Sequence, residues 1–350
     1  LFEAVDSRMK FCILSLAGRD MREPEASFAF FLHDPAELGD ADKAFTMTPE
    51  EIELLNPNTG TCPVFRSRRD ADLAIQITRK AFAWVRDGEV SGNPWGVKVK
   101  QGLYHLTNDL SKGYISDDID RGEFDGKRGV YEAKMIHQFD HRFAGYSGGR
   151  VVESTQANKS DPDFLIASRY FANDDFGARV DAGYGYQWFV AYRDIARSTD
   201  LRSWIAAILP WRPTSYTVRT VVGLNEDAGM AACLVANMNS FVADYALRQD
   251  LAGAHLSDHL VKQAPIFSSD SLRSHSEFLA NRVLELSYVA QDLASFAEDL
   301  GDGGSPFRWD EERRAVMRAE LDALFFHLYG VSRDDVDYIM ETFPIVKRKD

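Results

Sequence analysis

The sequence predicts an α+β protein in which an irregular, strongly curved sheet precedes an antiparallel helical region. Short β-prone runs separated by turn residues fill residues 88–265, which is typical of a sheet domain rich in loops. After Pro265, apolar residues recur at spacings of three and four, and this pattern predicts helices. Two short apolar runs stand near the start of the chain. We therefore expect three parts, residues 1–45, 46–265 and 266–350.

Local signals predict the N-terminal elements. The apolar runs at residues 8–17 and 27–32 predict a buried β-hairpin or two neighbouring strands. Thr48 and Pro49 offer a helix cap and a proline suited to the first helical position, so a short helix is expected to follow. Residues 65–85 predict a longer helix, whose apolar face carries Leu73, Ile77 and Ala81.

The central part alternates strands and turns. Residues 147–185 are rich in Ser, Asp and Gly, so we expect an insertion or a long loop there. One helix is expected at residues 239–248. The predicted strands are residues 97–99, 130–137, 187–192, 204–209, 215–222 and 231–236.

The C-terminal part predicts two long helices, at residues 276–300 and 310–329, each with its apolar residues on one face. Gly330 ends the second helix, and Ser332 resembles the start of a capping box for another. The solvent faces are acidic, because residues 270–343 hold about 7 Lys and Arg against 16 Asp and Glu.

The net charge of −14 opposes a nucleic-acid role, since duplex DNA repels an acidic surface. The charge is uneven, however: residues 60–150 hold about 15 Lys and Arg against 12 Asp and Glu. This asymmetry predicts separate duties along the chain.

The sequence also favours a cytoplasmic location. No apolar run approaches the roughly 18 residues of a membrane span, and the start has no signal-peptide pattern. The three cysteines form no CxxC motif, which argues against a zinc ribbon and for a reducing compartment. Both ends look like cuts, so we expect the chain to be a piece of a larger protein.

Most enzyme chemistry is excluded by missing motifs. Amino methylation of DNA typically needs an Asp/Asn-Pro-Pro-Tyr/Phe loop, and this chain has no Pro-Pro dipeptide. A glycine-rich cofactor loop, a GxSxG elbow, a P-loop and an HExxH motif are also missing. We therefore expect no catalytic residue and no cofactor site in this chain.

His137, Asp140 and His141 allow a different interpretation, a metal-binding hydrolase. Two histidines four positions apart share a face on a helix or a strand, and Asp140 stands beside the second. No third ligand is identifiable, so we expect no metal site and keep the hydrolase as an alternative. A protein-interaction scaffold built on the acidic helices is the other alternative.

Several stretches resemble one family closely. Residues 56–71 (NPNTGTCPVFRSRRDA) look like the segment that follows the catalytic domain in type IIG-like restriction–modification DNA methyltransferases. Residues 131–143 (YEAKMIHQFDHRF) are similar to that family's recognition-domain signature. Further similar stretches are residues 192–197, 234–241, 307–314 and 343–350, and residues 253–265 look like the exit from such a domain.

The resemblance implies the following organisation. Residues 1–45 would be the last strands of an upstream methyltransferase domain, residues 46–265 a TaqI-type target-recognition domain, and residues 266–350 a helical spacer. Members of this family methylate the N6 amine of adenine in DNA with S-adenosylmethionine, in restriction–modification or related phage-defence systems. The implied partners are double-stranded DNA, the upstream methyltransferase domain of the same polypeptide and other subunits of the defence system.

Recognition of duplex DNA needs cations for phosphates and polar side chains for base edges. Arg66, Arg68 and Arg69 are candidates for phosphate contacts at a helix start, with pairing to Asp70 and Asp72 as the alternative. Lys134, Gln138 and Arg142 would project to one side of a strand and read a groove. The predicted DNA-binding residues are Arg66, Arg68, Arg69, Lys134, His137, Gln138, His141, Arg142, Arg193 and Arg197.

Overall fold

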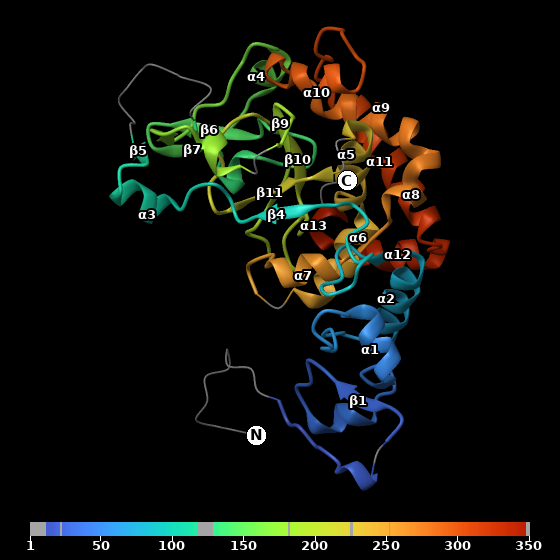
Figure 1. The fold of residues 1–350 in the computed structure, drawn as a ribbon. Coiled ribbons are helices and arrows are strands. Elements are labelled where there is room, and N and C mark those ends of the chain that lie inside the picture. Colours follow the sequence, from blue (N-terminus) through green and yellow to red (C-terminus); the bar gives the residue numbers. More distant parts are fainter. Residues whose placement is uncertain are drawn as a thin grey trace.

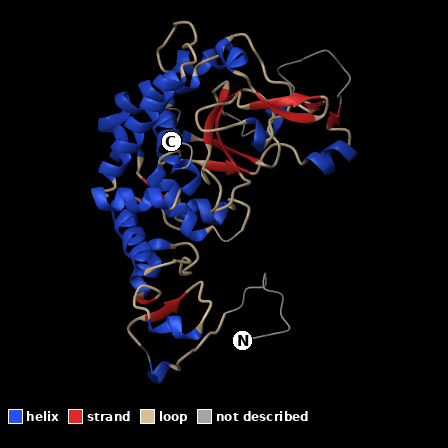
Figure 2. Cartoon of the chain, turned by 180° about the vertical axis from the view of Figure 1, so that it is seen from behind, coloured by secondary structure: helices blue, strands red, loops and turns tan. Residues whose placement is uncertain are grey.

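The computed structural model describes residues 12–347, apart from residue 22 and residues 118–128, 181–182, 225–226 and 252. It has an α+β fold, as predicted: small antiparallel sheets lie beside a large group of helices (Figures 1 and 2). A narrower N-terminal part extends from one end of this body (Figure 1). Residues 8–11 of the first predicted strand and residues 348–350 of the C-terminal stretch lie outside the described residues.

A four-stranded antiparallel sheet lies at the centre of the body. In spatial order its strands are β10 (Ala206–Pro210), β9 (Trp188–Arg193), β11 (Val218–Val222) and β4 (Lys98–Lys100), which confirms four of the six predicted runs. Arg193 lies opposite Val218, and Tyr192 opposite Ala206. All residues of β9, β10 and β11 except Arg193 are buried, because both faces of the sheet are covered.

Two predicted strands are wrong. Residues 231–236 lie in helix α5 (Ala228–Met238), which Asp227 caps by accepting a hydrogen bond from the Met230 amide. This helix is apolar all round because it is buried between the sheet and the outer helices, and so short an apolar run does not distinguish helix from strand. Residues 130–137 form isolated bridges and the 3-10 helix η3 (Ala133–Met135).

The outer helices pack around α5. They are α6 (Phe241–Asp250), α7 (Asp258–Gln263), α8 (Ser269–Leu272), η6 (Arg273–His275), α9 (Ser276–Ser287), η7 (Gln291–Leu293), α10 (Ala294–Asp299), α11 (Glu311–Leu328), α12 (Arg333–Glu341) and α13 (Pro344–Lys347). The predicted helix at 276–300 is interrupted after α9, where the carbonyls of Tyr288 and Val289 accept hydrogen bonds from Phe307 and Arg142. Helix α11 is confirmed, and Ser332 caps α12.

The N-terminal part has a small core of its own around Phe45 and Phe65. The predicted pairing of the two apolar runs is wrong, since β1 (Ala26–Ala29) pairs with β2 (Ala44–Met47). The predicted helices are confirmed as α1 (Pro49–Leu55), capped by Thr48, and α2 (Arg68–Lys80). The remaining elements here are η1 (Arg19–Met21) and η2 (Pro35–Gly39).

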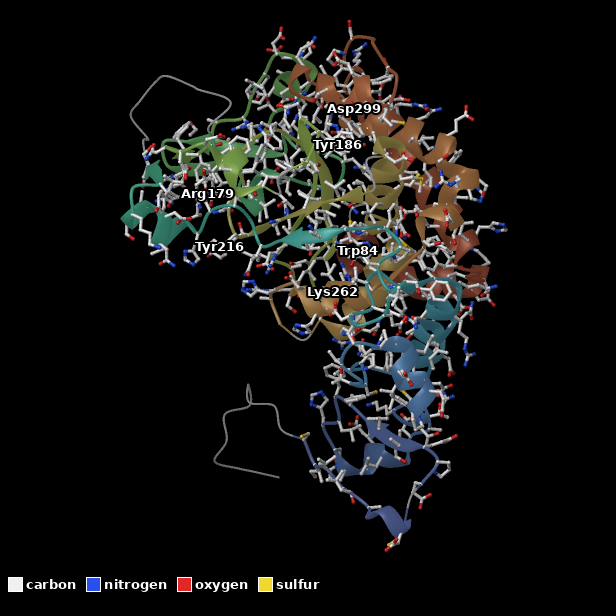
Figure 3. All side chains as sticks on the ribbon, in the orientation of Figure 1. Trp84, Arg179, Tyr186, Tyr216, Lys262 and Asp299 are labelled. Atoms are coloured by element: carbon white, nitrogen blue, oxygen red, sulfur yellow. The ribbon has the colours of Figure 1, made fainter. Side chains whose placement is uncertain are left out.

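The loop predicted at residues 147–185 carries regular structure on the β-rich side of the body. Its elements are β7 (Arg150–Glu153), α4 (Gln156–Ser160), β8 (Tyr170–Ala172) and η4 (Phe176–Arg179), where β7 pairs with β6 (Ala144–Ser147) and β8 with β5 (Ile115–Asp117), which follows α3 (Leu106–Ser111). Figure 3 shows Arg179 and Tyr216 on this side, and Tyr186 and Asp299 where the sheet meets the outer helices.

One apolar core joins the sheet to the outer helices. It extends from Leu73 in α2 to Phe343 after α12. At the boundary predicted after residue 265, β12 (Pro265–Ile266) pairs with β3 (Phe82–Ala83), so this segment belongs to the packed body. Among the described residues, no helix has both the length and the apolar character to span a membrane.

Candidate nucleic-acid interface

Residues 137–140 form a tight turn at one end of the sheet instead of the predicted strand. The His137 amide donates to the Asp140 carbonyl at 2.8 Å, and the Asp140 amide donates back to His137 at 3.0 Å. Phe139 has a φ of 55°, and its amide donates to the Ala206 carbonyl. Its ring is buried in the main core. The burial of this ring therefore overrides the β propensity of the neighbouring residues.

The turn directs three predicted DNA-binding side chains into the protein, so the predicted groove-reading row of Lys134, Gln138 and Arg142 is wrong. Gln138 donates to the Asn239 carbonyl at 2.9 Å, and His141 Nε2 lies 2.8 Å from Asp292 Oδ1. The fully buried Arg142 donates to four backbone carbonyls, those of Lys159 (3.0 Å), Asp161 (2.8 Å), Phe164 (2.9 Å) and Val289 (2.9 Å). A buried guanidinium needs such acceptors, and these side chains hold the fold together.

The three residues of the alternative metal site have separate partners. Asp140 pairs with Lys159 at 2.8 Å. Burial opposes ionisation of this carboxyl, but Lys159 together with Arg314 and His141 lowers the pKa of Asp140. His141 pairs with Asp292, whose pKa is also lowered despite burial. The His137 ring packs in a tilted arrangement against Phe143, with 4.9 Å between the ring centroids. In the described parts of the chain, no group of three or more His, Cys, Asp and Glu is arranged to hold a metal ion.

Four other predicted residues lie around the end of the sheet where β9 finishes. Lys134 is exposed in η3, and Arg197 is exposed in the loop that follows β9. Arg193 donates through Nε to the Ile136 carbonyl at 2.7 Å, which ties the end of β9 to the residue before His137. We call Lys134, His137, Arg193 and Arg197, together with His255, the sheet-end surface.

Burial shapes the electrostatics of this surface. Burial first, and then the positive charge of Arg193, lowers the pKa of His137 to about 3, so this imidazole is neutral at physiological pH. Burial also lowers the pKa of Arg193 to about 10, which leaves its guanidinium charged at neutral pH. The surface therefore offers cationic donors from Lys134, Arg193 and Arg197 and a neutral ring that can donate or accept one hydrogen bond.

His255 belongs to this surface but was not predicted from the sequence. The Leu256 amide donates to the Asp194 carbonyl (2.7 Å) and the Ala196 amide to Ala254 (3.2 Å), so residues 194–196 and 254–256 lie side by side. His255 Nδ1 is 2.9 Å from Asp194 Oδ2, although the His255 side chain is 60% exposed. Its Nε2 is thereby oriented away from the carboxylate. The only sequence signal was that both stretches resemble the same family.

Buried Asp194 also anchors Arg219 at 2.9 Å, and Arg219 reaches Asp258 at 3.1 Å. Neither Asp194 nor Arg219 was predicted from the sequence as a site residue. The Arg219 guanidinium is 6% exposed and is paired on two sides. It therefore orients the carboxylate that holds His255, and it is not itself a contact for a ligand.

The cluster of Arg66, Arg68 and Arg69 lies apart from the sheet-end surface, at the start of α2 (Figure 1). Arg66 stacks over the Phe31 ring at 4.7 Å. Arg68 pairs with Asp72 at 2.9 Å, which is the alternative that the sequence left open. Arg69 pairs with Asp335 at 3.0 Å and stacks over Tyr338. The contacts of Arg69 join α2 to α12, whereas the Arg68 pair lies within α2.

The arrangement at the sheet end suits binding of an anionic polymer better than bond-breaking chemistry. Its side chains are cations and imidazoles from different parts of the chain, which match the oxygen atoms of phosphates and base edges. No protein-family model matches this chain, and no similar curated protein was found.

Proposed function

We propose that this chain recognises double-stranded DNA through the sheet-end surface. It would act as the specificity part of an S-adenosylmethionine-dependent DNA adenine-N6 methyltransferase of a restriction–modification or related phage-defence system. The methyl donor and the catalytic loop would belong to an upstream methyltransferase domain of the same polypeptide. Other subunits of the defence system are further expected partners.

One observation carries the proposal. Lys134 and His137 come from one segment and Arg193 and Arg197 from another, yet the four residues lie around one end of the central sheet. Exposed Arg and Lys side chains supply phosphate contacts, and His255 and His137 are suited to hydrogen bonds with base edges. Three residues that the sequence nominated for the same role, Gln138, His141 and Arg142, support this surface from inside.

The acidic helices limit the affinity of the isolated chain. Glu312 on α11 and Asp334 on α12 are examples of exposed carboxylates, and the repulsion between such groups and DNA acts beyond direct contact. We therefore expect weak binding at physiological salt and stronger binding as the salt concentration falls.

The test is fluorescence-anisotropy binding of the chain to a randomised duplex pool at low and moderate salt, followed by sequencing of the bound fraction. We expect an enriched motif that contains an adenine, with affinity that falls steeply as salt rises. The double variant Lys134→Glu/Arg197→Glu should weaken binding by at least roughly tenfold, since two phosphate contacts become repulsive. Its control is Arg273→Glu/Arg333→Glu, a double variant with the same change of net charge at exposed positions on the outer helices.

Two outcomes would contradict the proposal. One is that the wild-type chain, also when joined to its upstream region, leaves duplexes unbound at low salt. The other is that the two double variants weaken binding equally, since binding would then depend on overall charge and not on the sheet-end surface.

A further inference from the structure

The loop after β9 and the loop before α7 hold His255 beside Asp194. Ile195 and His255 form an isolated antiparallel bridge, and the Leu256 amide donates to the Asp194 carbonyl at 2.7 Å. His255 Nδ1 lies 2.9 Å from Asp194 Oδ2. The backbone pairing and this side-chain hydrogen bond therefore hold the imidazole in one orientation.

The two carboxylate oxygens of Asp194 have different partners. Oδ1 accepts two hydrogen bonds from Arg219, from Nε at 3.1 Å and from Nη2 at 2.9 Å, and Oδ2 faces His255. A guanidinium has donors only, and the Asp194 side chain is 4% exposed. The carboxylate is thus a fixed acceptor on both sides, so the hydrogen atom between Asp194 and the imidazole belongs to Nδ1.

A proton on Nδ1 determines the chemistry of the other ring nitrogen. In a neutral imidazole one nitrogen is a donor and the other an acceptor, so Nε2 of His255 carries a lone pair and no hydrogen atom. Within the described residues this Nε2 has no hydrogen-bond partner, and the side chain is 60% exposed. His141 is arranged the other way round, since its Nε2 faces Asp292 and its Nδ1 is buried. His255 therefore presents an acceptor to a ligand.

The bases differ in what they offer to an acceptor. In the major groove adenine and cytosine present an amino group, at N6 and N4, whereas the polar atoms of guanine and thymine there are acceptors only. An acceptor at Nε2 can bond to either amino group, but it would face a lone pair on guanine or thymine. The direction of one hydrogen bond thus discriminates between bases.

We propose that Asp194 fixes the tautomer of His255 so that Nε2 accepts a hydrogen bond from the amino group of an adenine or a cytosine in the major groove. This inference rests on the DNA-binding function proposed above. It makes His255 a specificity-determining residue and Asp194 a positioning residue. Arg219 contributes from behind by holding the carboxylate in place.

The first experiment reads the tautomer by ¹⁵N–¹H correlation NMR of the histidine rings at alkaline pH, where imidazoles are neutral. The His255 signals are identified by their loss in His255→Ala. We expect the proton on Nδ1 in His255 and on Nε2 in His141. In Asp194→Asn the amide oxygen should keep Arg219, and the amide nitrogen should donate to the imidazole, so the proton of His255 should move to Nε2. Circular dichroism checks that the variants are folded.

The second experiment measures binding at the same pH to duplexes of the enriched motif in which each base is replaced in turn. One position should prefer adenine or cytosine. Removing that amino group, with purine for adenine or pyrimidin-2-one for cytosine, should weaken wild-type binding roughly threefold to tenfold, the value of one hydrogen bond. Asp194→Asn should reverse the preference to guanine or thymine, and His255→Ala should remove it. The control His33→Ala, at an exposed position in the N-terminal part, should leave it unchanged.

The outcomes separate this inference from the proposed function. A proton on Nε2 of the neutral His255 ring in the wild type would overturn the inference. So would a base preference that His255→Ala leaves unchanged, or a preference for guanine that is lost with inosine, since the amino group would then lie in the minor groove. A wild-type chain that binds no duplex at low salt would refute the proposed function, and with it the identification of the ligand as a base.

Discussion

Arg142 illustrates how a side chain that looks like a DNA contact can be a structural centre. Its guanidinium joins the turn at residues 137–140 to the loop at residues 159–164 and to the carbonyl of Val289 beside the outer helices. Residue type and sequence position do not reveal burial, so the sequence nominated it for the groove. The same holds for Gln138 and His141, whose partners Asn239 and Asp292 are distant in the chain.

Arg142→Gln is expected to destabilise the protein by about 3–5 kcal/mol, because four buried carbonyls lose their donors. Arg142→Lys should rescue little, since an ammonium group cannot reach acceptors spread around a planar fork. Urea unfolding measures both effects, with the exposed Arg150→Gln as control. A change below about 1 kcal/mol would show that the network is dispensable.

Asp250 gives a prediction for the pH dependence of stability. Burial raises the pKa of Asp250 to about 6 in the folded protein, against an ordinary value near 3.8, although Asn56 Nδ2 donates to it at 3.2 Å. The folded state therefore binds more protons between these values, and this group lowers stability as pH rises from about 4 to 6. Asp250→Asn should stabilise the protein by on the order of 1–2 kcal/mol at pH 7.

The effect of the same substitution should be much smaller at pH 4, where the folded carboxyl is protonated and the unfolded one, with an ordinary pKa near 3.8, is only about half ionised. Urea unfolding at pH 4, 5.5 and 7 checks this, with Asp270→Asn, whose carboxylate is 90% exposed, as the control. A stabilisation that is equal at all three pH values would refute the assignment of the effect to the carboxylate charge.

At the scale of elements, α2 is fixed to the outer helices by a buried carboxylate. Asp70 accepts hydrogen bonds from the hydroxyl groups of Tyr245 in α6 (2.7 Å) and Tyr338 in α12 (2.9 Å). Asp70→Ala should cost about 2–4 kcal/mol because both hydroxyl groups lose their acceptor. Asp72→Ala, at an exposed position two residues further along α2, should cost less than about 0.5 kcal/mol. Chemical denaturation compares the two, and equal losses would contradict this role.

The sequence predicted those elements whose signals are local. Thr48 and Ser332 cap α1 and α12 as expected, because a capping hydrogen bond needs only residues within one turn. Helix α5 and the turn at Phe139 were missed, since their conformations depend on burial against distant segments. For the site, Lys134 and Arg197 are exposed as expected, whereas the pairing of His255 with Asp194 depends on a contact between two loops far apart in the chain.

At the scale of the whole molecule, the sheet and the outer helices share one core. The domain boundary at residue 265 remains a prediction from the family resemblance. In the structure, the apolar residues on the two sides of this boundary pack together. Helix α5 in particular is covered by α9, so residues 46–265 without the helices that follow Ile266 would expose an apolar surface.

We therefore expect the body to unfold in one transition. Far-ultraviolet circular dichroism, which reports mainly on helices, should give the same urea midpoint as tryptophan fluorescence, which comes from six residues including Trp188 and Trp204 in or beside the sheet. Residues 46–265 produced alone should bind a hydrophobic dye or aggregate. Two separated transitions, or a soluble and folded fragment, would show instead that the sheet domain is autonomous.

The hydrogen bonds from Arg142 to four backbone carbonyls also restrict where the length of such a chain can vary. The turn between β6 and β7 is made by Gly148 and Gly149, both with positive φ, and it is exposed. Added residues there would leave the rest of the body in place. One residue inserted between Lys159 and Phe164 would move carbonyls that a single guanidinium must meet together with Val289. Related chains should therefore differ in length at the turn between β6 and β7 and keep the number of residues between Lys159 and Phe164 constant.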